Sequence, residues 1–103
     1  MSVVLNGILC TNIGITSQAI MTTAGLLYGA AIIPKSTGIV MLYVFDETAT
    51  ASGTQVLGVR VSSTAGIATT IFAVPIACRT GIFASVVTSS VGDQVVIFYG
   101  PSV

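Results

Sequence analysis

The sequence contains no histidine and no tryptophan, and only 6% of its 103 residues are charged. Without histidine, neither a Ser-His-Asp nor a Cys-His catalytic arrangement can form within one chain, and a histidine-based metal site is excluded as well. A formal net charge of zero leaves no basic face to neutralise phosphates, so we expect no nucleic-acid partner. We therefore expect a protein that is not an enzyme and that carries no cofactor or metal.

The three carboxylates offer no further catalytic arrangement. Asp46 and Glu47 are adjacent, so on an extended backbone they point to opposite faces, and Asp93 falls in a predicted hairpin turn. We interpret Asp46-Glu47 as a solvated strand end that also discourages edge-to-edge pairing. Because charges are so scarce, we expect Arg60 and Arg79 to form ion pairs with these carboxylates across a subunit boundary.

Cysteine and long hydrophobic runs are also limited. Cys10 and Cys78 form no CxxC spacing, and we interpret both as small buried hydrophobes, with their pairing left open. Residues 1–34 are uncharged but lack the basic start of a secretory signal. The apolar run Ala19–Ile33 is shorter than the roughly 20 residues that a spanning helix needs. We therefore expect no membrane partner.

Residues that favour strands dominate the chain, and Gly, Ser, Asn and Pro interrupt them at short intervals. This pattern predicts one all-β domain over residues 1–103, an antiparallel β-sandwich or jelly roll of seven to eight short strands. Pro34 and Pro75 are expected to end strands, and Gly53 and Gly92 to supply positive φ in turns. The expected strands are Val3–Leu9, Thr16–Met21, Leu26–Ile33, Ile39–Phe45, 55–63, Ile67–Val74, Ile82–Thr88 and Gln94–Tyr99.

Three of these strands, at residues 26–33, 39–45 and 94–99, are apolar on both faces. A two-layer sandwich buries only one face of each strand. The second apolar face predicts subunit contact, because obligate interfaces resemble a core cut in half. We expect a homo-oligomer whose interface contains Ile39, Met41, Leu42, Tyr43, Val44, Val96 and Phe98.

Two stretches carry a resemblance that extends from Gly25 onward: "GLLYGAAIIPKSTGIVMLYVFDETATASGTQVLGVRVSS" at 25–63 and "FAVPIACRTGIFASVVTSSVGDQVVIFYGPSV" at 72–103. An apolar strand that ends in an acidic turn, and a closing apolar strand, resemble the small β-sandwich virion proteins of tailed bacteriophages. Within that group the chain is most similar to capsid decoration (cement) proteins and head–tail accessory proteins. Residues 1–24 lie outside the resemblance, and we expect them to form a strand or an arm that packs on a neighbour.

The resemblance implies a structural protein that forms trimers or other oligomers, binds the major capsid protein and braces the phage head. It implies a location on the capsid surface of the virion, after assembly in the host cytoplasm. A phage tail or head–tail accessory protein is the alternative within the same class. A small-ligand or carbohydrate-binding β-sandwich and a small membrane protein are the alternatives from other classes.

Overall fold

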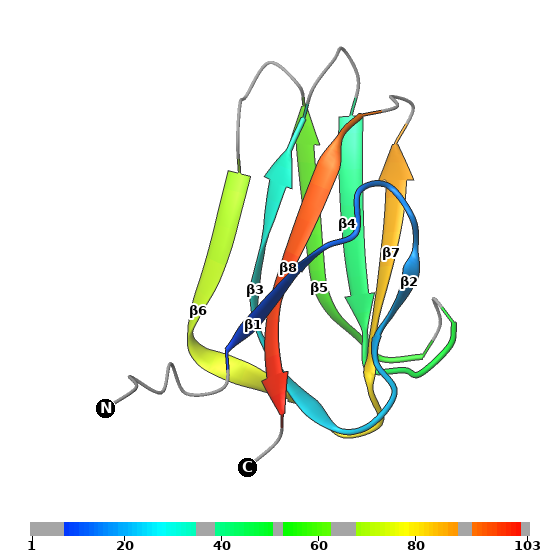
Figure 1. Ribbon diagram of the computed structural model, residues 1–103, viewed down its shortest axis with the longest axis vertical. Helices are drawn as coiled ribbons and strands as arrows, with labels where there is room; N and C mark the ends of the chain where they lie inside the picture. The colour runs from blue at the N-terminus through cyan, green and yellow to red at the C-terminus, as the bar shows by residue number, and fades with distance from the viewer. Residues whose placement is uncertain (1–7, 35–38, 51–52, 63–67, 89–91, 102–103) are drawn as a thin grey trace.

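The computed structural model describes residues 8–34, 39–50, 53–62, 68–88 and 92–101, with residues 68–73 described by their backbone alone. This part of the chain is all-β, and no helical segment of membrane-spanning length and hydrophobicity occurs in it (Figure 1). The strands are β1 (Leu9–Asn12), β2 (Gln18–Met21), β3 (Gly25–Ile33), β4 (Ile39–Phe45), β5 (Gln55–Ser62), β6 (Ala68–Cys78), β7 (Ile82–Thr88) and β8 (Gln94–Pro101).

The strands form two four-stranded sheets, in the orders β1-β8-β3-β6 and β2-β7-β4-β5, and all pairings are antiparallel. Strands from the two halves of the chain pair from the outside inwards: β1 with β8, β2 with β7, β3 with β6, and β4 with β5. One long antiparallel hairpin rolled into two layers gives this order, which is the jelly roll. The predicted sandwich or jelly roll is confirmed.

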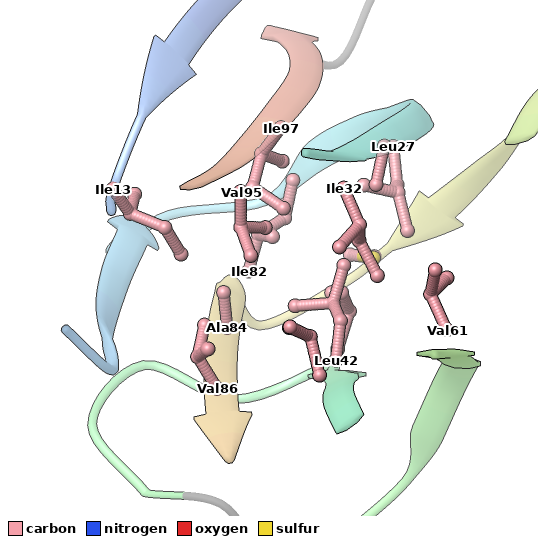
Figure 2. Packing of buried hydrophobic residues seen from close by; sticks show 14 residues of the cluster. Ile13, Leu27, Ile32, Leu42, Val61, Ile82, Ala84, Val86, Val95 and Ile97 are labelled. Carbon is pink, nitrogen blue, oxygen red and sulfur yellow. The ribbon is translucent and has the colours of Figure 1, made fainter. Parts of the chain in front are cut away.

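The core lies between the two sheets and is apolar (Figure 2). In β4 the burial alternates along the strand, so that Val40, Leu42 and Val44 are at most 1% exposed while their neighbours point outward. The facing strands β3 and β8 contribute Leu27 and Ile97, both fully buried. The alternation of a strand thus separates two apolar faces of β4, and the face with Val40, Leu42 and Val44 lies in the core.

The beginning of the chain differs from the prediction. The first strand was expected to end at Leu9, but Cys10–Asn12 belong to β1 and pair with β8. The turn begins at Asn12, because its Oδ1 accepts a hydrogen bond from the Gly14 N–H at 2.9 Å, which is the geometry of an Asx turn. Of the expected strand Val3–Leu9, residues 3–7 lie outside the described residues.

The N-terminal strands belong to the sandwich of their own chain. β1 extends one sheet and β2 the other, so residues 9–21 follow the strand alternative rather than the arm on a neighbour. Between them, the Ser17 hydroxyl accepts a hydrogen bond from the Val86 N–H at 2.9 Å and so continues the pairing along β7. Residues 1–7 lie outside the described residues.

The prediction that Pro75 ends a strand is wrong, because β6 continues through it to Cys78. The register with β3 moves from Leu27 opposite Ile76 to Gly29 opposite Ile71, so β6 carries extra residues around the proline. A proline without an N–H is tolerated there because β6 is an edge strand. The positive φ angles expected for Gly53 and Gly92 are confirmed, at 83° and 100°.

Candidate functional site

The outer face of the second sheet is apolar along most of β4 and β7, where solvent would normally meet polar side chains. Residues of β4 and β7 that alternate with the core residues point outward there, and cross-strand neighbours such as Met41 and Val87, or Phe45 and Phe83, are directly opposite each other. Ile39 and Val87 are 38% and 46% exposed. We call this set the outer patch: Ile39, Met41, Tyr43, Phe45, Phe83 and Val87.

Tyr43 lies in the middle of β4, between Met41 and Phe45 on the outward face. Its ring rests against Gly58 of β5, where a Cβ atom would lie 3.6 Å from the ring Cδ1. Its hydroxyl donates a hydrogen bond to the Met41 sulfur at 3.2 Å. The 3.6 Å spacing at Gly58 is an ordinary van der Waals contact, and the Gln55 side-chain amide lies nearer to the same Cβ position, at 2.9 Å.

The predicted interface residues are divided among three places. Ile39, Met41 and Tyr43 belong to the outer patch. Leu42 and Val44 are fully buried in the core of their own chain, so placing them in a subunit interface was wrong. Val96 and Phe98 alternate with the buried Val95 and Ile97 of β8, and so they point to the outer face of the other sheet.

Three members of the outer patch, Phe45, Phe83 and Val87, were not among the predicted interface residues. The signal for them was present in the sequence, because Phe83 and Val87 share one face of an alternating strand. What was missing was the pairing of β7 with β4, which places the two strands side by side. Strand neighbours cannot be read from the alternation of one strand.

Asp46 binds its own chain. Its carboxylate follows β4 and accepts hydrogen bonds from the N–H groups of Thr80, Arg79 and Gly81, at 2.8, 3.0 and 3.3 Å. Partial burial raises its pKa, but these three hydrogen bonds and the Arg79 charge outweigh that effect, so the pKa lies below its ordinary value of 3.8. Asp46 therefore holds the turn between β6 and β7 against the end of β4.

Asp93, Arg60 and Glu47 were also predicted to form ion pairs with a partner subunit. Asp93 is only 3% exposed and accepts a hydrogen bond from the Thr88 hydroxyl at 2.5 Å, so its predicted role in an inter-subunit ion pair was wrong. Arg60 is exposed on the outer face, directly opposite Met41. Glu47 lies against Gly53, the glycine before β5. Arg60 and Glu47 keep their predicted role as candidates for contacts between subunits.

The two cysteines are free thiols in different surroundings: Cys10 is exposed on β1 and Cys78 is buried at the end of β6. The interpretation of both as buried hydrophobes holds for Cys78 and is wrong for Cys10. Burial raises the pKa of the Cys78 thiol to about 11, with a contribution from the nearby Asp46 charge.

We expect Ellman's reagent to modify only Cys10 in the native protein, because the thiolate is the reactive form and Cys78 is both shielded and protonated. In denaturant both thiols should react, and Cys10→Ser should abolish the native reaction. Intact-mass spectrometry would count the labels. Rapid labelling of Cys78 in the folded state would contradict the described packing.

Within the described ranges, no three cysteine or carboxylate side chains come together as a metal site would require, and no pocket is found. The outer patch is therefore the feature on which a functional hypothesis can be built. No protein-family model, no curated protein and no solved structure matches this chain significantly.

Proposed function

We propose that this protein is a structural component of a phage virion, a decoration protein that covers and stabilises the capsid as a homo-oligomer. The observation that carries the proposal is the outer patch, an apolar face on a sheet whose other face already fills the core. Exposed apolar areas of this kind mark surfaces that bind other proteins. With so few charges on the chain, such a surface favours a stable, desolvated contact.

The fold is compatible with this role. Double-sheet jelly rolls recur in viral capsid domains and also in lectins, so the fold alone does not choose between these functions. The outer patch favours the structural role over carbohydrate binding. Tyr43 and Ser85, which lie opposite each other, are the polar residues on an outward face of β4 and β7 that otherwise consists of Met, Ile, Val and Phe and offers few hydrogen bonds to sugar hydroxyls. The major capsid protein is the proposed partner of the outer patch.

Mass spectrometry of purified phage particles tests the proposal. We expect the protein in virions, at a copy number comparable to that of the major capsid protein and in heads rather than in isolated tails. Recovery in tails only would favour the tail accessory alternative. Absence from particles would refute both, and recovery from detergent-extracted membranes would favour the membrane alternative.

Val87→Asp tests the outer patch itself. An aspartate there would be left unpaired in the contact, and we expect head occupancy to fall by at least about tenfold, which corresponds to about 1.4 kcal/mol. Val74→Asp is the matched control, because Val74 is 78% exposed and lies on β6 of the other sheet. Bound protein is measured on purified heads after mixing with each variant. Equal loss by both variants, or by neither, would contradict the assignment of this face.

A further inference from the structure

The four edge strands of the sandwich differ in their protection against pairing with another chain. Natural sheets protect their edges with very short strands, bulges and prolines. The edges β1 and β2 are four residues long, and the edge β6 carries extra residues around Pro75. The fourth edge, β5, is eight residues long and contains no proline. It has an irregularity at Val56 and the charged Arg60, but its register with β4 is regular from Leu57 to Ser62.

β5 also leaves apolar side chains half covered at this edge. Leu57 and Val59 pack against the core but stay partly exposed, whereas Val61 is only 5% exposed. Within the described part of the chain, β4 is the strand partner of β5, and the other side of β5 is the boundary of the sheet. A strand added there would pair with the backbone and cover these side chains together.

We propose that β5 pairs with β5 of a second copy, antiparallel about a twofold axis, so that the two four-stranded sheets become one continuous sheet. A twofold arrangement uses the same edge of both copies, and closes after two copies. This inference deepens the proposed homo-oligomer by assigning the self-contact to the edge of the sheet. The outer patch stays available for the capsid.

The side chains of β5 select one register for this pairing. Residues directly opposite each other must point to the same face of the sheet. The irregularity between β4 and β5 at Val56 breaks the alternation, so the symmetric pairing has to use residues 57–61. Placing Gly58 opposite its own copy would bring Arg60 against Val56, and placing Arg60 opposite its own copy would bring two like charges together. Centring the pairing on Leu57 or on Val61 would leave a single residue pair within 57–61. The remaining register places Val59 opposite Val59 of the second copy.

In this register both faces of the pairing are complementary. On the core side, Leu57 of one copy lies opposite Val61 of the other, so apolar side chains meet. On the outer side, Arg60 lies opposite Gly58 of the second copy, beside that copy's Tyr43 ring, which rests against Gly58. A guanidinium beside an aromatic ring gains a cation–π attraction. A Cβ at Gly58 would lie 2.9 Å from the Gln55 side-chain amide, so Arg60 of the second copy would lie beside this flexible side chain as well as beside the Tyr43 ring.

The first test is the mass of the purified protein in solution. The monomer has a mass of 10.4 kDa, and we expect light scattering to give twice this value for the wild type. Val59→Lys directs a charge inward at the edge, which natural edge strands use against pairing, and should give a monomer. Circular dichroism checks that this variant is folded. A monomeric or trimeric wild type would overturn the inference. Loss of the dimer on deletion of residues 1–7 would also overturn it, because the N-terminal segment, and not β5 of the second copy, would then make the contact between the copies.

Cysteine cross-linking tests the register without relying on a disruptive variant. In a Cys10→Ser background, Val59→Cys should form a disulfide-linked dimer under mild oxidation, because directly opposite Cα atoms lie about 4.5–5.5 Å apart. Arg60→Cys is the matched control, since its two copies would be roughly 8 Å apart and too distant for a disulfide. Cross-linking of Arg60→Cys but not of Val59→Cys would refute this register.

The two proposals fail separately. Both tests of pairing use the purified protein alone, so a cross-linked dimer that is absent from virions would refute the capsid role and leave the β5 pairing intact. If the protein were found in virions but were monomeric in solution and did not cross-link through Val59→Cys, the β5 pairing would be refuted and the virion location would stand.

Discussion

Leu42→Ala is expected to lower the free energy of unfolding by about 2–5 kcal/mol. Leu42 is fully buried at the centre of β4, between Val59 of β5 and Val86 of β7, and belongs to the hydrophobic core, so the truncation leaves a cavity in that core. Small domains have a total stability of about 5–15 kcal/mol, so this loss is a large fraction of the whole. Urea denaturation followed by circular dichroism measures it, at one fixed protein concentration because a dimer makes the transition depend on concentration.

Ile39→Ala is the matched control on the same strand. Ile39 lies on the opposite face and is 38% exposed, so we expect its truncation to cost less than about 1 kcal/mol. If the two variants were equally stable, or if Ile39→Ala were the more damaging, β4 would face the other way. A shift of one residue in strand register exchanges the two faces, and this pair of variants detects it directly.

Asp46→Ala is expected to lower the stability by about 1–2 kcal/mol, comparable to the loss of a helix cap in which a side chain also accepts backbone hydrogen bonds. The carboxylate accepts hydrogen bonds from three consecutive N–H groups, including that of the buried Gly81. Gly81 has no room to rearrange, because a Cβ there would lie 2.6 Å from the Met21 carbonyl oxygen. Asp46→Asn keeps one acceptor oxygen and should lose less. Equal stability of the wild type and Asp46→Ala would show that the turn holds without this anchor.

The same contact predicts a pH dependence. The pKa of Asp46 is lower in the folded state than its ordinary value of 3.8, so the folded state holds the charged form more strongly. Its contribution to stability is therefore complete above about pH 5 and is lost as the pH falls through the ordinary value and then through the folded pKa. We expect the difference in stability between the wild type and Asp46→Asn to shrink over this acid range. A difference that stays constant down to pH 2 would contradict the role of the charge.

The strand bounds show how much of the structure local sequence patterns can predict. Ile39–Phe45 and Ile82–Thr88 were predicted with the bounds that the structure has, because their apolar residues are bounded by polar turns. Pro75 was misjudged because the penalty for proline depends on whether the strand lies inside a sheet or at its edge. The order of strands decides this, and it is a property of the whole chain.

The contacts of Asp46 and the position of β5 at a sheet edge depended even more on strand order. Asp46 was interpreted as a solvated strand end, and only the position of the β6–β7 turn beside it reveals three N–H donors from residues far along the sequence. Likewise, the long, proline-free edge at β5 appears only when the neighbours of all four edge strands are known.

The sequence by itself determined that the chain forms short antiparallel strands, that it has few charges, and that several strands are apolar on both faces. Periodicity of two and turn residues are local properties, so they can be read without coordinates. Only the tertiary structure decided that Leu42 and Val44 face the core while Met41 and Tyr43 face outward. Both faces of β4 are hydrophobic enough for burial, and the packing of one sheet on the other selects between them.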